Sequence, residues 1–194
     1  MADTLTAEGL KRLHDVAARH VAEDKIPGLV ALVGAGEQVH VETVGTLSVG
    51  GPPVARDSLF RIASTTKPVT AAATLALADE GLLGLDEPVD RPLRGGAPVL
   101  SADAATAMTS DQLTPAQKAY GGLGRDFFNG QSWGFGQAVL DSGAFDWAGG
   151  LGTTWMADPA KDPTVIVLTQ RQFESPDTPQ AHREIQEAAY AALA

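Results

Sequence analysis

Apolar residues recur at helical spacing near both ends of the chain. The first stretch predicts an amphipathic helix from Thr6, a helix-capping residue type, to about Asp24. The last stretch predicts a second helix over 179–193, with Ile185, Ala188, Ala189 and Ala192 on one stripe. Both helices therefore present one apolar face to a common core.

Two β-rich runs follow the first helix. They cover 28–35 and 38–46 and are separated by Gly36 and Glu37, which predicts a hairpin. The second run alternates Val39, Val41 and Thr43 with His40 and Glu42, so one face of this strand should be wetter than the other.

A third helix is predicted from Ser64 to Glu80, ending at Gly81. Pro68 lies in its first turn, where proline is tolerated. The segment 70–78 carries no charge on any side, which is typical of a helix that is buried all round.

The rest of the chain predicts a loop over 84–96, a short helix over 102–108, and strands at 133–140, 151–157 and 164–170. We therefore expect one domain over 1–194 with an α/β fold of the α+β type. A single antiparallel β-sheet would carry the N- and C-terminal helices on one face and the 64–80 helix on the other.

The composition of the chain argues against several classes of function. The 194 residues carry a formal net charge of −10, so bulk charge argues against binding nucleic acid or an anionic membrane. The absence of cysteine excludes disulfides, thiol catalysis and cysteine-ligated metals, and His14 and His20 lack the spacing of a zinc pair. No cofactor is implied. The polar start of the chain and the lack of a long apolar run predict a soluble, cytoplasmic protein.

Ser64 and Lys67 are three residues apart at the start of a helix, so their side chains project from one face. A serine hydroxyl becomes a good nucleophile when a base takes its proton, and a lysine can be that base if burial and the helix N-terminus lower its pKa. The simpler alternative is a capping serine and a solvated lysine.

The run 59–89 supports the catalytic interpretation. It resembles the active-site helix and following loop of the serine β-lactamase and penicillin-binding-protein superfamily, nearest to the class C-like β-lactamases and related esterases. The matching segments are Ala78-Asp79-Glu80-Gly81 and Leu85-Asp86-Glu87-Pro88-Val89. The resemblance implies that Ser64 is the nucleophile and Lys67 the base.

A second segment, 145–153, resembles the family strand that carries a Lys-Thr-Gly motif, which many esterase-like members replace. By this resemblance Trp147, Ala148 and Gly149 contact the substrate, and the backbone N–H groups of Ser64 and Gly150 form the oxyanion hole. Trp147 in place of the motif lysine favours esters over β-lactams. The alternative for these residues is a half-buried sheet aromatic followed by turn glycines.

One family element is missing. Family members carry a Tyr-x-Asn or Ser-x-Asn in an inserted helical domain, and neither Tyr120 nor Tyr190 stands in a Tyr-x-Asn. The segment 91–132 is interpreted as a shortened connection in place of that domain. The charge-free face of the 64–80 helix, over 70–78, then needs another cover, either residues 95–132 or a second subunit in a homo-oligomer.

Two functions follow from this comparison. The first is a serine hydrolase that acts on small-molecule esters, and slowly on β-lactam-like ligands, through an acyl-Ser64 intermediate. The second is a catalytically weak or inactive remnant that serves as a binding or scaffold protein.

A competing motif surrounds Ser132 in Gly130-Gln131-Ser132-Trp133-Gly134, which fits the nucleophile elbow of α/β hydrolases, with His182 downstream. That elbow needs an apolar strand before the serine and a helix after it. Neither is predicted, so a turn serine that leads into a strand is favoured.

Overall fold

The computed structural model describes residues 4–23, 26–85, 101–119 and 128–193. The chain divides into two compact units. One, here called the sheet unit, comprises Met1–Thr65 and Asp146–Ala194; the other, the helix unit, comprises Thr66–Phe145. A single domain over 1–194 stays a prediction, and much of the shortened connection 91–132 lies outside the described residues.

The sheet unit is built on antiparallel strands in the order β2-β1-β7-β6-β5. Their bounds are β1 Gly28–Ala35, β2 Gln38–Gly45, β5 Phe145–Gly149, β6 Thr153–Ala157 and β7 Pro163–Thr169. The predicted hairpin is confirmed, since Ala35 pairs with Gln38 across the turn. The centre of the sheet joins distant parts of the chain, because β1 pairs with β7 from Leu29 opposite Thr169 to Ala35 opposite Pro163.

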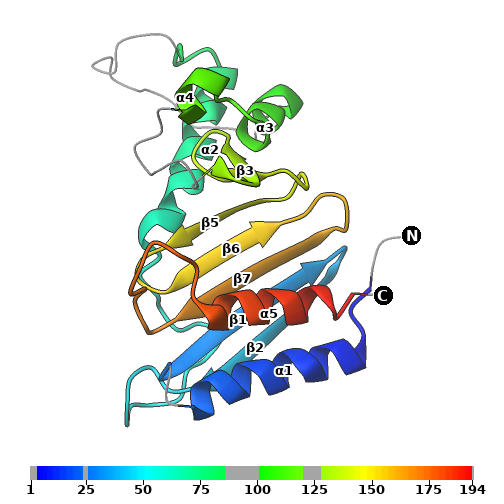
Figure 1. Cartoon of the computed structure of the whole chain (residues 1–194), viewed down its shortest axis with the longest axis vertical. Helices are drawn as coiled ribbons and strands as arrows, with labels where there is room; N and C mark the ends of the chain where they lie inside the picture. The colour runs from blue at the N-terminus through cyan, green and yellow to red at the C-terminus, as the bar shows by residue number, and fades with distance from the viewer. Residues whose placement is uncertain (1–3, 24–25, 86–100, 120–127, 194) are drawn as a thin grey trace. The chain divides into compact units, whose positions relative to one another are not determined.

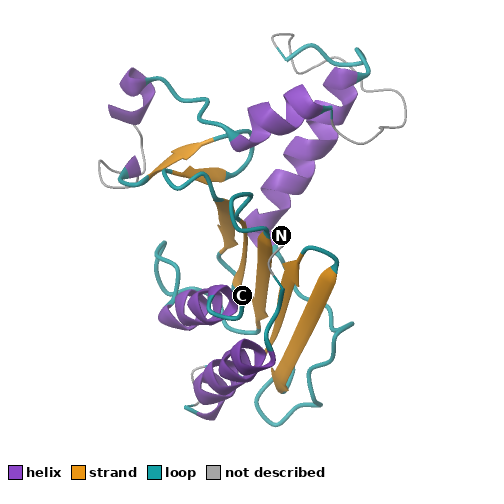
Figure 2. Ribbon diagram, turned by 90° about the vertical axis from the view of Figure 1, so that its right-hand side faces the viewer, coloured by secondary structure: helices purple, strands orange, loops and turns teal. Residues whose placement is uncertain are grey.

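The terminal helices α1 (Ala7–Ala22) and α5 (Gln180–Tyr190) lie side by side on one face of this sheet (Figures 1 and 2), as predicted. Thr6 caps α1, since its Oγ1 accepts a hydrogen bond from the N–H of Gly9 at 3.2 Å. The core between helices and sheet is formed by Leu13, Ala17, Leu29, Ala31, Val33, Val165, Val167, Ile185, Ala188 and Ala189. The apolar stripes of both helices therefore bury against alternate strand positions.

The wetter face of β2 is not the one that its polar residues suggest. His40 lies opposite the fully buried Val33, so His40 and Glu42 share the helix-covered face. There His14 Nδ1 lies 3.0 Å from a Glu42 oxygen. On the other face Val39 is 57% exposed. The polar residues are tolerated beside the helices because β2 is an edge strand, where His14 of α1 supplies a partner for Glu42.

The helix unit contains α2 (Thr66–Asp79), α3 (Ala102–Thr109), α4 (Pro115–Ala119), β3 (Gln131–Trp133) and β4 (Ala138–Leu140). The short helix predicted over 102–108 is confirmed as α3, which Ser101 caps through a hydrogen bond from the N–H of Ala104 at 3.1 Å. It packs on α2 through a small core of Leu75, Ala104 and Met108. Within the described ranges, no helix has the length and apolar character needed to cross a bilayer.

Two expectations for this unit are wrong. The helix α2 is not buried all round, since its buried residues are Pro68, Leu75 and Ala76, while Val69 is 64% exposed. Its uncharged positions are mostly alanine and threonine, whose small side chains tolerate contact with water. The single strand predicted over 133–140 is a hairpin of β3 and β4, because Gly136, at φ +84°, reverses the chain.

Candidate active site

Ser64 lies in η1, a turn of 3-10 helix over Ala63–Thr65 that leads directly into α2. The residue before it, Ala63, has φ +46°, in the left-handed region that side chains with a Cβ rarely adopt. Such a conformation persists only where surrounding contacts fix it. The candidate nucleophile therefore follows a strained turn rather than a regular helix start.

The contacts that fix this turn converge on the backbone carbonyl of Ile62. It accepts hydrogen bonds from the N–H of Thr65 at 3.0 Å, from the Thr65 hydroxyl, and from the Thr153 hydroxyl at 3.0 Å. Both threonines are buried, at 8% and 1% exposure. Since Thr153 is the first residue of β6, the serine turn is tied to the sheet.

Gly149, the last residue of β5, approaches the same carbonyl. A Cβ at this position would lie 2.2 Å from the Ile62 oxygen and 2.4 Å from Thr153 Oγ1, so only glycine fits. Because strand side chains alternate, Trp147 shares this face of β5 with Gly149, whereas Ala148 faces the opposite side. The structure therefore brings the serine turn beside Gly149 and separates Ala148 from Trp147.

The peptide between Gly149 and Gly150 is held in orientation from both sides. The Gly149 carbonyl accepts from the N–H of Gly152 at 3.0 Å, and the Gly150 carbonyl accepts from the N–H of Phe173 at 2.9 Å. In a trans peptide the N–H is opposite the C=O, so the Gly150 N–H points away from Gly152. A Cβ at Gly150 would meet no atom within 4 Å, which leaves room for a ligand.

Lys67, the candidate base, is the second residue of α2 and is exposed. The helix therefore leaves this side chain exposed rather than enclosed among apolar groups. The reason is the incomplete cover of α2, which leaves its first turn in contact with solvent. Lys67 still follows Ser64 by three residues along one continuous helical segment, as the sequence predicted.

Tyr190 does not replace the missing Tyr-x-Asn. Tyr190 donates a hydrogen bond to Asp158 Oδ2 at 3.1 Å. Burial, reinforced by this bond, raises the pKa of Tyr190 to about 12, so its hydroxyl keeps its proton. Tyr120 lies outside the described residues.

Asp146 is a feature that sequence reasoning missed. It lies on β5, and burial raises the pKa of its carboxyl to about 6. By strand alternation its side chain lies on the face opposite Trp147. The only signal in the sequence was an acid between two aromatic residues of a strand.

The competing nucleophile, Ser132, is buried and takes part in another hydrogen bond. It lies on β3, is 5% exposed, and donates a hydrogen bond to Asp111 Oδ1. Hydrogen bonds from Lys118 and then Ser132 lower the pKa of Asp111 to about 2. A turn and β4 follow instead of a helix, so the context of a nucleophile elbow is absent from the described residues.

His182, the histidine of that alternative, belongs to the sheet unit. Its Nδ1 lies 3.1 Å from Thr154 Oγ1, and its ring stands edge-on to Phe173 with centroids 5.1 Å apart. Burial lowers the pKa of His182 to about 4, so the ring is neutral at pH 7.

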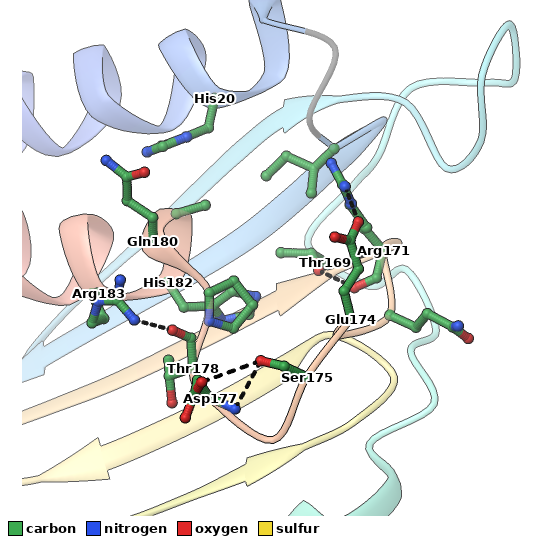
Figure 3. Close-up of a pocket in the computed structure, with 14 residues that line it drawn as sticks. His20, Thr169, Arg171, Glu174, Ser175, Asp177, Thr178, Gln180, His182 and Arg183 are labelled. Carbon is green, nitrogen blue, oxygen red and sulfur yellow. Dashed lines mark hydrogen bonds and ion pairs between the residues drawn. The ribbon is translucent and has the colours of Figure 1, made fainter.

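A cavity of about 750 Å³ lies where α5 begins (Figure 3). Among its charged side chains, Arg171 is paired with Glu174, Arg183 donates to the carbonyl of Thr178, and Asp177 accepts from the Ser175 hydroxyl at 3.5 Å. One wall, the segment 169–173, also supports the Gly150 region, since Thr169 Oγ1 donates to the Gly152 carbonyl at 2.9 Å. In the described ranges, no three histidine or acidic side chains converge as a metal site would require.

Comparison with known proteins places the chain in a family. The Beta-lactamase family model matches residues 13–117. Protein Rv1367c of Mycobacterium tuberculosis is 41% identical over 96 residues, which are 48% of this chain and 24% of that protein. Esterase EstB of Burkholderia gladioli is 36% identical over 104 residues, 53% of this chain and 26% of the esterase. The chain thus matches about a quarter of the length of these relatives.

Solved structures show the same fold at low identity. EstCE1, a hydrolase with promiscuous acyltransferase activity, aligns with a TM-score of 0.70 and 15% identity over 94% of this chain and 98% of that chain. Unliganded simvastatin synthase from Aspergillus terreus aligns at 0.77 and 13%, over 96% and 99%. The family match covers more than half of the sequence and the fold agrees with it, so the chain belongs to the Beta-lactamase family.

Proposed function

We propose that the chain is a serine hydrolase that acts on small-molecule esters through an acyl-Ser64 intermediate. One observation carries the proposal: the Ile62 carbonyl accepts two hydrogen bonds from Thr65 within the Ser64 turn and a third from Thr153 of β6, which ties the turn to the sheet where Gly149 packs against the same oxygen. A nucleophile and an oxyanion donor must be held in fixed relation, and this junction supplies such support.

The chemistry assigns one role to each group. Lys67 Nζ, in its neutral form, accepts the proton of Ser64 Oγ, and the oxygen attacks the ester carbonyl. The N–H groups of Ser64 and Gly150 stabilise the oxyanion, and the alcohol leaves with the proton from Lys67. Water then hydrolyses the acyl-Ser64 ester and regenerates the hydroxyl.

Esters are preferred to β-lactams as substrates in this proposal. A β-lactam carboxylate needs a cationic partner, and Trp147 stands where the family motif has lysine. The similarity to an esterase and to a hydrolase with acyltransferase activity supports this preference. Slow acylation by β-lactams is the expected secondary activity.

A second candidate function is a binding or scaffold protein with little or no turnover. The exposure of Lys67 favours it, because enclosure among apolar groups helps a lysine to act as a base, and the described structure leaves this side chain exposed. The commitment of Tyr190 to Asp158 favours it too, since that hydroxyl cannot assist Lys67.

Covalent labelling of the full chain separates the two functions. We expect a fluorophosphonate to add one adduct to the wild type and to Ser132→Ala, but none to Ser64→Ala, measured by intact-protein mass spectrometry. Ser132→Ala is the matched control because this serine is buried and bonded to Asp111. An adduct that survives in Ser64→Ala, or no adduct on the folded wild type, would contradict the hydrolase.

A further inference from the structure

A groove of about 600 Å³ follows one face of α2 within the helix unit. Its floor is formed by α2 positions 66, 67, 70, 71, 74 and 75, which helical spacing places on one stripe. From Lys67 to Leu75 this stripe runs for about 12 Å, at about 1.5 Å per residue. Trp133 and Phe135, at the β3–β4 hairpin, form part of the wall, and Leu85 also lines it. The hairpin and α2 are drawn in Figure 1.

The groove is apolar along its length and cationic at one end. Thr70 Oγ1 donates to the Thr66 carbonyl at 3.1 Å and Thr74 Oγ1 to the Thr70 carbonyl at 2.9 Å, so both hydroxyls are used inside the helix. Lys67 is the single charged residue among those that line the groove. No lining residue is acidic, so nothing in the groove repels an oxyanion or a carboxylate.

Close packing between α2 and its neighbours defines the shape of the groove. A Cβ at Gly136 would lie 2.6 Å from the Ala71 Cβ and 3.0 Å from the Lys67 carbonyl, so the hairpin presses directly on α2. On the same helix, Leu75 packs with Met108 of α3, and Phe135 packs against this cluster. The floor and the hairpin wall of the groove are therefore fixed by packing.

We propose that this groove binds the unbranched apolar acyl chain of the substrate, with the ester carbonyl at the Lys67 end. The inference rests on the proposed function, because Ser64 precedes Lys67 by three residues and would react with that carbonyl. A linear chain fits the length and the apolar lining, and its polar head lies beside the one cation. The substrate class is thus an ester of a medium- or long-chain fatty acid.

Direct binding tests the groove without any catalytic step. Dodecanoate is titrated into the full chain and followed by Trp fluorescence, with Trp133→Phe to assign the signal. Thr74→Phe fills the end of the groove that is far from Lys67 and should weaken binding of the long chain about tenfold. Ala73→Phe is the matched control, because Ala73 is exposed on the same turn of α2 and does not line the groove. Equal affinity in Thr74→Phe and the wild type overturns the proposal.

Acylation of Ser64 by p-nitrophenyl acetate and p-nitrophenyl dodecanoate supplies the second measurement. The ratio of dodecanoate to acetate rates should fall about tenfold in Thr74→Phe and stay constant in Ala73→Phe. An unchanged ratio with Ser64 acylated overturns the groove and leaves the hydrolase standing. Dodecanoate binding that Thr74→Phe weakens, with no acylation of Ser64, supports the groove and overturns the hydrolase.

Discussion

Ile62 shapes the candidate site through its backbone carbonyl rather than through its side chain. Three hydrogen bonds are donated to this oxygen. Gly149 packs directly against it, at a distance that a Cβ would not allow. The two threonines that donate to this oxygen are buried, so displacing it would leave each buried hydroxyl with one partner fewer. The position of Ser64 therefore depends on residues that themselves perform no chemistry.

Gly149→Ala tests this dependence. The added Cβ meets the Ile62 oxygen, a backbone atom that cannot rotate away. We expect the free energy of unfolding to fall by about 1–3 kcal/mol and fluorophosphonate labelling of Ser64 to slow. Thermal unfolding and the labelling rate measure the two effects.

Gly150→Ala is the control for stability at the neighbouring residue. A Cβ there meets nothing within 4 Å, so the free energy of unfolding should change by less than about 0.5 kcal/mol. Equal destabilisation by both substitutions would show that the contact with Ile62 is not what requires glycine at 149.

Asp146 gives the chain a predictable response to pH. Burial raises the pKa of this carboxyl from 3.8 to about 6, so the folded state holds a proton that the unfolded state releases. This group therefore lowers stability as pH rises from about 4 through about 6, by at most about 3 kcal/mol. Asp146→Asn should be more stable than the wild type at pH 8 and similar to it at pH 4, in urea unfolding.

His182 should change the free energy of unfolding with pH in the opposite direction, which provides a check. Its pKa is lowered from 6.5 to about 4, so stability is lost as pH falls through this window. In His182→Gln the loss below pH 6.5 should disappear while the Asp146 effect persists. A wild-type slope in Asp146→Asn would refute the assignment to that carboxyl.

At the scale of elements, the sequence predicted those structures whose causes are local. Thr6 caps α1, Gly36 and Glu37 join β1 to β2, and α3 begins after Ser101. The exposure of α2 was mispredicted because burial depends on which distant segments pack on it. The β3–β4 hairpin was missed although Gly136 interrupts its apolar run, which is a common turn signal.

The features of the candidate site also divide into those that the sequence predicted and those that depend on distant parts of the chain. Ser64 and Lys67 carry a spacing that can be read directly, and family resemblance pointed to Trp147 and Gly149. The role of the Ile62 carbonyl and the partial burial of Asp146 have no side-chain pattern of their own. Both arise from pairing between strands and turns that are far apart in sequence.

Met108→Ala tests the packing of α3 on α2. Truncation leaves a cavity beside Leu75 and Ala104, which should cost about 2–4 kcal/mol in the helix unit. Hydrogen exchange should speed up in α2 and α3 while β1 and β7 stay protected. Met156→Ala is the control, because Met156 packs against the core of the sheet unit and should give the reverse pattern.

At the scale of the whole molecule, apolar side chains in α2 and just after it are exposed to solvent. Val69 is 64% exposed and Leu82 43%, even though α3 covers part of the helix. Self-association through this face stays a prediction, and we expect a dimer in sedimentation velocity at micromolar concentration.

Val69→Glu should shift this equilibrium to the monomer, because dimerisation would bury an unpaired charge. Val49→Glu is the control, since Val49 is 91% exposed in the sheet unit, away from α2 in the sequence. A wild type that stays monomeric at this concentration would exclude the dimer.

The pairing of β1 with β7 sets a condition on how the protein is made. Leu29 meets Thr169 across 140 positions of sequence, so the centre of the sheet cannot close until most of the chain has been translated. At about 5–20 residues per second, the ribosome needs roughly 7–28 s to deliver the partner strand. During that interval the apolar residues of β1 and of the inner face of α1 cannot yet pack against β7 and α5. A holdase chaperone would bind these segments of the nascent chain.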